Sequence, residues 1–318
     1  MARPKVGGSL VRGPSGVSPE ALLLPLGAGF LYSCAAIALK RALGAGISGG
    51  WVNLLSNVSM ALLFQIFWLF PEATHGAEIP LSLFLAPIAC GSLFFLGQAC
   101  TFRAISAGDV SVATPLLGTK VLIVALLSFL LLGKALPVSW WFGSLLATLG
   151  IGLISYAPGN SAQNHGLTII WSMLAAGVFA LTDVLVQHWV PRFGFARFAP
   201  LMFAVPGILS IVYVPRLLRE GIFLPTVGGR IAFQWLAAGV LLLALQCLGM
   251  YTSIGHFGSA TVTNILYGSR CLWSVILVWL LGSIGGTTPP ALGVYRAVMI
   301  RRMIGAVLLF AAMALVLS

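Results

Sequence analysis

Long apolar runs recur along the whole chain, and they limit its possible folds more than any other feature. Ten such runs are separated by short segments that hold most of the charged residues. A helix of about 20 apolar residues crosses a hydrocarbon core of about 30 Å. Lipid offers no partner to an open backbone, and the runs are too long and too uniformly apolar for barrel strands. The sequence therefore predicts an all-α polytopic membrane protein with ten transmembrane helices.

The composition fits a protein whose solvent is lipid. Only 7% of the residues are charged and the mean hydropathy is +1.05, whereas a soluble domain holds about 25% charged residues. The net charge is +11, but the basic residues are scattered between apolar runs and form no stripe with aromatics. We therefore expect them to face lipid headgroups, not nucleic acid. The five cysteines lie within apolar runs without a C-x-x-C pair, so neither a disulfide framework nor a metal site is expected.

The ten runs form two sets of five that match in order and length. The first set covers residues 21–157 and the second covers 167–318, with the uncharged linker 158–166 between them. The basic, Gly- and Pro-rich segment 1–20 is expected to be disordered. A repeat with an odd number of helices enters the membrane from opposite sides in its two copies. The sequence thus predicts two inverted five-helix repeats, an architecture that places a substrate site at the midplane between them.

Residue matches support the repeat. "SAGDVSVATPLLGTKVLIVALLSFLLLG" aligns with "HFGSATVTNILYGSRCLWSVILVWLLG", and in this alignment Lys120 falls on Arg270. Independently, "LGAGFLYSC" of the first helix matches "LAAGVFALTD" of the sixth, with Gly29 on Gly177. Equivalent positions in two copies approach a two-fold axis together. Lys120 and Arg270 are therefore expected to approach one central cavity from opposite sides.

Three charged side chains lie well inside the predicted helices: Lys120, Asp183 and Arg270. A charge at a helix centre costs about 2.5–3.5 kcal/mol on insertion scales, so such residues normally face a cavity or a partner. Two cations in one cavity favour an anionic ligand, which Arg270 can bind bidentately while Lys120 acts as a compact charge. In the structural alternative both cations snorkel or pair with carboxylates. Asp183 is either a proton-coupling site, a gate that releases the cations when substrate is absent, or the permanent counter-ion of Lys120 or Arg270.

Neutral polar residues in the runs are further candidates for substrate binding. Asn53 and Asn57 stand one turn apart on the second helix, and Asn264, Tyr267 and Arg270 share one face of the ninth. Such residues either border the substrate path or form interhelical hydrogen bonds. The complete set of candidate substrate-binding residues is Lys120, Arg270, Tyr267, Asn264, Asn53, Asn57, Gln98, Gln246 and Tyr32.

The segment "TFRAISAGDVSVATPLLGTKVLIVALLSFLLLGKALPVSWWFGSLLATLGIGLI" (101–154) resembles the third-to-fifth-helix signature of the drug/metabolite transporter superfamily, in its ten-helix EamA-like form. Where many members carry a glutamate after the closing L-G, this chain has Lys134 and Ser283. The resemblance implies transport by alternating access and both termini in the cytoplasm, although the loops opposite the N-terminus hold nine basic residues against six on its own side. It also implies a bacterial inner membrane. The triose-phosphate and nucleotide-sugar branches of the superfamily place basic residues against substrate phosphate in the two helices that here carry Lys120 and Arg270.

The function expected is secondary transport of a small anionic or zwitterionic metabolite, held between Lys120 and Arg270. The alternative is an exporter of cationic or neutral drugs or amino acids, with Asp183 as the coupling carboxylate and a proton as a possible coupling ion. No phosphate-binding loop or hydrolase motif is present, so neither ATP-driven transport nor an enzyme is expected, and no cofactor. Gly143, Ala147 and Gly150 form a small-residue face for scaffold or homodimer contacts.

Overall fold

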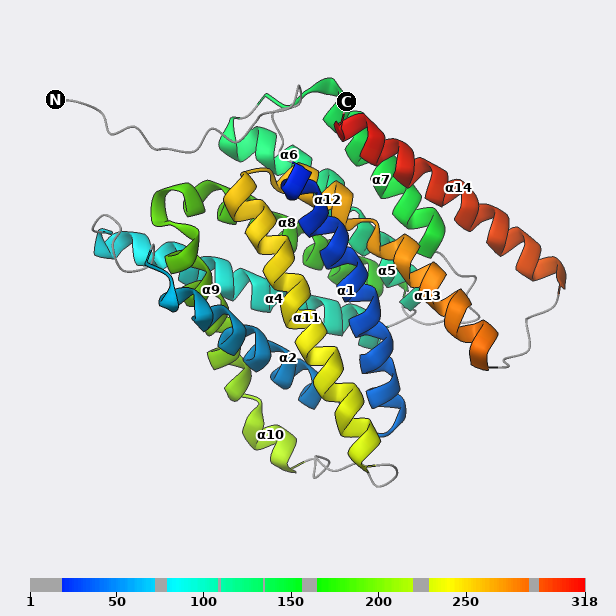
Figure 1. Ribbon diagram of the computed structural model, residues 1–318, viewed down its shortest axis with the longest axis horizontal. Coiled ribbons are helices and arrows are strands. Elements are labelled where there is room, and N and C mark those ends of the chain that lie inside the picture. The colour runs from blue at the N-terminus through cyan, green and yellow to red at the C-terminus, as the bar shows by residue number, and fades with distance from the viewer. Residues whose placement is uncertain are drawn as a thin grey trace.

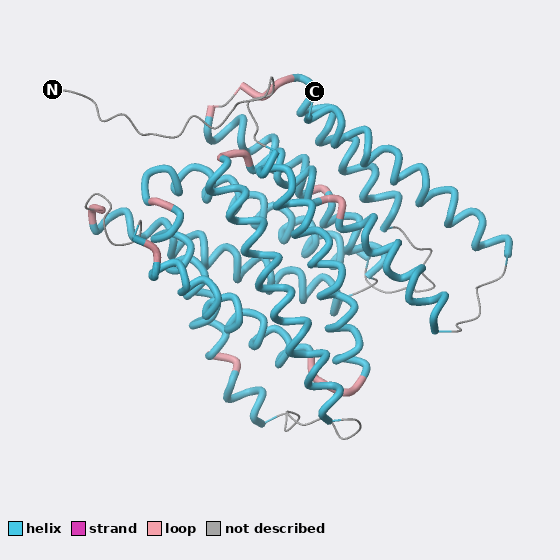
Figure 2. The backbone as a smooth tube through the Cα atoms, in the orientation of Figure 1, coloured by secondary structure: helices cyan, strands magenta, loops and turns pink. Residues whose placement is uncertain are grey.

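The computed structural model describes residues 19–71, 79–107, 110–133, 135–155, 165–219, 229–285 and 292–317. These residues are almost entirely helical, and Figure 2 shows no strand among them. The helices are α1 (Pro19–Gly44), α2 (Gly49–Phe64) with η1 (Gln65–Leu69), η2 (Leu81–Phe84) with α4 (Leu85–Ala107), α5 (Val110–Gly118), α6 (Lys120–Leu132), α7 (Val138–Ser155), α8 (His165–Phe193), α9 (Phe195–Ile211), α10 (Val214–Arg219), α11 (Gly229–Phe257), α12 (Ala260–Tyr267), α13 (Arg270–Gly285) and α14 (Leu292–Leu317).

Each of the ten predicted runs holds helix, with ends that differ by a few residues. Within the described ranges, nine helical segments are long and apolar enough to span a membrane. The ninth run is divided between α12 and α13, so neither piece reaches that length. The predicted all-α polytopic membrane fold is confirmed. Segment 1–20 and linker 158–166 lie outside the described residues, except that Pro19 begins α1 and His165 begins α8.

The main helix contacts join the first half of the chain to the second. α1 packs along α11, α4 along α8, α2 along α9 and α7 along α14 (Figure 1). A two-fold relation that exchanges α1 with α8 and α4 with α11 would turn the first pair into the second. The same exchange converts the α6–α8 contact into the α13–α1 contact, and both are present. The pairing is the one expected of two related halves, and the inverted orientation of the repeats stays a prediction.

α7 and α14 cross closely at one edge of the bundle because both helices carry glycine at the crossing (Figure 1). A Cβ added to Gly150 would lie 2.7 Å from the Gly305 carbonyl oxygen, and one added to Gly305 would lie 2.8 Å from the Gly150 oxygen. Gly143 approaches Val316 in the same way, at 2.8 Å. The small-residue face of the fifth helix is thus a scaffold contact within the chain. The homodimer stays a prediction, and its contact has to form through other surfaces of the bundle.

The fourth and ninth spans are each interrupted directly before their cation. α5 ends at Gly118 and α6 starts at Lys120, while α12 ends at Tyr267 and α13 starts at Arg270. At both breaks the backbone tightens to i→i−3 hydrogen bonds, as in the bond from the Thr119 amide to the Leu116 oxygen. Lys120 and Arg270 are therefore the first residues of new helical segments in the middle of the bundle.

Candidate functional site

A cavity of about 320 Å³ lies at the centre of the bundle and is bordered by both cations. It extends toward the end of the bundle where α1 ends and α2 begins, opposite the C-terminus (Figure 1). α1, α2, α4 and α11 supply most of its wall, and α5, α6, α8, α12 and α13 each contribute one or two residues. Lys120 and Arg270 both border this cavity, and its use as a substrate site stays a prediction.

Arg270 reaches the cavity between two tyrosine rings. Its guanidinium carbon lies 5.0 Å from the ring centre of Tyr32 and 4.7 Å from that of Tyr267. Cation–π contacts of this kind stabilise a cation by about 0.5–2 kcal/mol without neutralising its charge. Of the six acidic residues, only Asp183 has a side chain that the structure describes, and its ion pair is with Lys120. Within the described residues, Arg270 has no carboxylate partner.

The backbone at Arg270 is held by a close contact with α1. The Ser33 hydroxyl donates to the Arg270 carbonyl oxygen at 2.8 Å and lies 3.0 Å from the Ser274 hydroxyl. A Cβ added to Gly29 would lie 2.8 Å from Ser269 Oγ and 3.0 Å from the Arg270 nitrogen. Glycine at position 29 thus lets α1 approach the break between α12 and α13. This contact fixes where the guanidinium enters the cavity.

Lys120 borders the same cavity but is already paired. Its Nζ lies 2.7 Å from Asp183 Oδ2, and Asp183 is fully buried while 15% of the Lys120 side chain is exposed. Asn264 Nδ2 donates to Asp183 Oδ2 at 2.7 Å, and the Tyr251 hydroxyl donates to Oδ1 at 3.3 Å. Three donors therefore surround the carboxylate. Of the two counter-ion roles left open by the sequence, Asp183 has the one with Lys120.

Seven of the nine residues predicted to bind substrate border the cavity: Lys120, Arg270, Tyr267, Asn53, Gln98, Gln246 and Tyr32. The other two are held elsewhere. Asn57 is fully buried and donates to Ser210 Oγ at 2.8 Å, so it joins α2 to α9. Asn264 lies behind the cavity wall and holds Asp183. Both therefore form interhelical hydrogen bonds, which the sequence left open as the alternative to bordering the substrate path.

Sequence reasoning missed the apolar part of the wall. Its largest members are aromatic or sulfur-containing: Met60, Phe94, Phe102, Phe179, Met250 and Tyr251. An apolar side chain in an apolar helix gives no contrast that marks it as cavity-lining. Ser56 was also missed, although it lies three residues after Asn53 and four before Met60, on the helical face that lines the cavity. This helical spacing from Asn53 was the signal in the sequence that could have identified Ser56.

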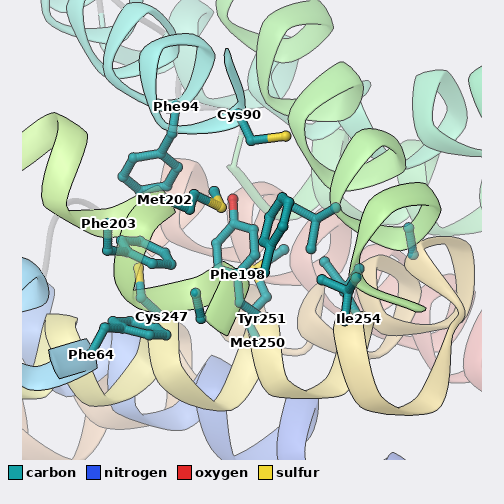
Figure 3. Packing of buried hydrophobic residues seen from close by; sticks show 14 of the residues in the cluster. Phe64, Cys90, Phe94, Phe198, Met202, Phe203, Cys247, Met250, Tyr251 and Ile254 are labelled. Atoms are coloured by element: carbon teal, nitrogen blue, oxygen red, sulfur yellow. The ribbon is translucent and has the colours of Figure 1, made fainter. Parts of the chain in front are cut away.

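The cavity wall adjoins a tightly packed aromatic cluster formed by α2, α4, α9 and α11. Phe64 and Phe203 stack with ring centres 3.9 Å apart, and Phe203 meets Tyr251 edge-on at 5.2 Å. Phe94 lies 5.4 Å from Phe203 and belongs to both the cluster and the cavity wall. Figure 3 shows these rings together with Met202 and Cys247.

A helical bundle long and apolar enough to span a membrane, with a partly charged cavity at its centre, is the arrangement found in secondary transporters. The model of the EamA-like transporter family matches residues 19–156, the first five-helix set. The match covers less than half of the chain and agrees with the resemblance seen in the sequence: residues 19–156 are similar to the EamA-like transporters.

A comparison with solved structures extends the fold match to both halves of the chain. The structure titled "Crystal structure of protein" is 17% identical, with a TM-score of 0.70 over 93% of this chain and 98% of the other. At that identity the likeness shows a shared fold alone. Comparison with curated protein sequences gave no match.

Proposed function

We propose that the protein is a secondary transporter that moves a small anionic or zwitterionic metabolite by alternating access. The central cavity is its substrate site. One observation carries the proposal: a guanidinium without a carboxylate partner in the described chain faces a cavity at the middle of a membrane bundle. A charge at this depth is costly unless something pairs with it. A negatively charged substrate is the partner that a transporter can supply.

Polar atoms in the wall support a ligand with more than one polar group. Gln98 Oε1 and Ser56 Oγ are buried without a hydrogen-bond partner among the described residues, and both residues border the cavity. A buried acceptor left unpaired costs about 1–3 kcal/mol. A ligand that donates a hydrogen bond to Gln98 would remove that cost. Hydroxy acids and zwitterions combine such a donor with an anionic group.

The arrangement around the cavity supports alternating access. Its wall adjoins the aromatic cluster, and in the proposed cycle Phe64 and Phe203 separate to open a path on that side while the wall between α1 and α11 closes. The pairing of equivalent helices across the bundle supports such an exchange.

The alternative, a cation exporter coupled through Asp183, has weaker support. Asp183 is fully buried behind Lys120 and does not border the cavity, so a cationic substrate finds no free carboxylate there among the residues that the structure describes. Coupling to protons would require Lys120 to leave Asp183 during the cycle. We retain proton coupling as a hypothesis for the driving force, separate from the binding site.

Thermal stability of the purified protein in detergent tests the proposal. Anionic, zwitterionic and cationic metabolites are compared, because a ligand at 100 times its Kd adds about 2.7 kcal/mol of stability. Anions or zwitterions should stabilise the wild type and the control Arg41→Gln, whose position does not border the cavity. They should not stabilise Arg270→Ala. Stabilisation by cations alone, or an Arg270→Ala protein that responds like the wild type, would refute the proposal.

A further inference from the structure

The two cations occupy equivalent places in the two halves, yet their surroundings differ in one respect. Lys120 has a carboxylate from α8, at 2.7 Å, and Arg270 has none within the described chain. The first helix of each half packs on the broken helix of the other half, α8 on α6 and α1 on α13. The place on α1 that corresponds to Asp183 on α8 should therefore face Arg270.

That place on α1 is occupied by alanine. With Gly29 on Gly177, Asp183 falls on Ala35, which is buried and does not border the cavity. Matching instead the rings that cover the two cations, Tyr32 over Arg270 and Phe179 over Lys120 at 5.6 Å, places Asp183 on Ala36, which borders the cavity. Ala36 also lies one turn after Tyr32, whose ring covers the guanidinium at 5.0 Å. Neither alanine carries a polar side-chain atom. The turn of α1 equivalent to the one that supplies the carboxylate to Lys120 thus supplies none to Arg270.

These pairings determine the charge balance of the site. Lys120 and Asp183 cancel, so the described groups around the cavity carry one net positive charge, located on Arg270. The aromatic rings on either side hold the guanidinium in place but do not neutralise it. A second anionic group in the ligand would find Lys120 already engaged by a carboxylate that is itself held by Asn264 and Tyr251.

Resting on the proposed function, we infer that the ligand's anionic group takes at Arg270 the place that Asp183 takes at Lys120. The site is a symmetric pair of ion-pair positions of which the protein completes only one. It selects ligands with a single anionic group, monoanions or zwitterions, over dianions and cations. Ala36 is a specificity-determining position because its small apolar side chain leaves the second ion-pair position to the ligand.

The test supplies the missing carboxylate from the protein. Ala36→Asp places an acidic group on the cavity wall, and Ala36→Asn is the matched control, with the same size and no charge. The probes are benzoate, isophthalate and benzylamine, similar rings that carry one negative charge, two negative charges and one positive charge. Affinity is measured by tryptophan fluorescence titration in detergent, and melting curves without ligand show that each variant is folded.

The wild type should bind benzoate more tightly than isophthalate or benzylamine. Loss of one charge-assisted contact should weaken benzoate binding by about 10- to 100-fold in Ala36→Asp and in Arg270→Gln, but not in Ala36→Asn. Ala36→Asp should in turn bind benzylamine more tightly than the wild type does. The control Arg41→Gln removes a cation at a position that does not border the cavity and should keep the benzoate affinity of the wild type.

The outcomes separate the inference from the proposed function. Tighter binding of isophthalate than benzoate, equal benzoate affinity in Ala36→Asp and Ala36→Asn, or a loss in Arg41→Gln as large as in Arg270→Gln would each overturn the inference while anion binding stands. A wild type that binds benzylamine alone, or none of the three probes, would contradict the proposed function, and the inference would fall with it.

Discussion

Removal of either partner of the Lys120–Asp183 pair should destabilise the protein, and by unequal amounts. At 2.7 Å the two unit charges attract by about 6 kcal/mol at an effective dielectric constant of 20, before the cost of desolvation is counted. Loss of one partner of a buried pair typically costs about 3–5 kcal/mol, because the other charge stays buried and unpaired. The structure indicates which end of that range applies to each partner.

Lys120→Met leaves Asp183 with no cation, and this carboxylate is fully buried. Only the Asn264 amide and the Tyr251 hydroxyl still donate to it, and it does not border the cavity. The loss should be near the upper limit, about 5 kcal/mol. Asp183→Asn leaves an ammonium that is 15% exposed and borders the cavity, where water can solvate it. This loss should be near the lower limit, about 3 kcal/mol.

The double variant Lys120→Met/Asp183→Asn removes both charges and should lose far less than the sum, about 1 kcal/mol. Unfolding of the four proteins in mixed detergent and SDS micelles, followed by tryptophan fluorescence, gives the free energies for the cycle. Additive losses would show that the pair is not coupled as described. A larger loss in Asp183→Asn than in Lys120→Met would refute the reasoning from burial.

Three further predictions concern single positions. Gly150→Ala should destabilise the fold by about 1–3 kcal/mol, because its Cβ would lie 2.7 Å from the Gly305 oxygen, and ligand affinity measured on the remaining folded protein should not change. Gly29→Ala should displace α1 from the α12–α13 break. The free energy of anion binding should decrease by more than the free energy of unfolding does. Asn57→Ala should lower stability by about 1–3 kcal/mol through its lost buried hydrogen bond and leave ligand affinity unchanged. Asn53→Ala should weaken ligand binding and leave stability unchanged in the same two assays.

Much of the candidate site could be predicted because a polar or charged residue in an apolar helix stands out. Lys120, Arg270 and five neutral polar residues were identified in this way, and all border one cavity. The same criterion also selected Asn57 and Asn264, which bond to other residues instead. A polar side chain in lipid needs a partner, but its helix alone does not say whether that partner is protein or ligand. Phe94 and Phe179 could not be found at all, since nothing in the sequence separates them from other apolar residues.

The sequence by itself determined the membrane fold, the number of helices and the approximate place of each. These features depend on hydrophobicity within one segment, because each span must satisfy its own backbone and cover about 30 Å of hydrocarbon. Equivalent positions for Lys120 and Arg270 also followed from the sequence, through the match between the two halves.

Only the tertiary structure decided which cation Asp183 neutralises. Its carboxylate is 2.7 Å from Lys120, while Arg270 lies between two tyrosine rings. The structure likewise decided that Phe64 and Phe203 stack in a cluster that adjoins the cavity wall. Ion pairs and packed rings depend on distances of a few ångströms between helices far apart in the chain. The pattern of one helix does not contain those distances, so the sequence left both questions open.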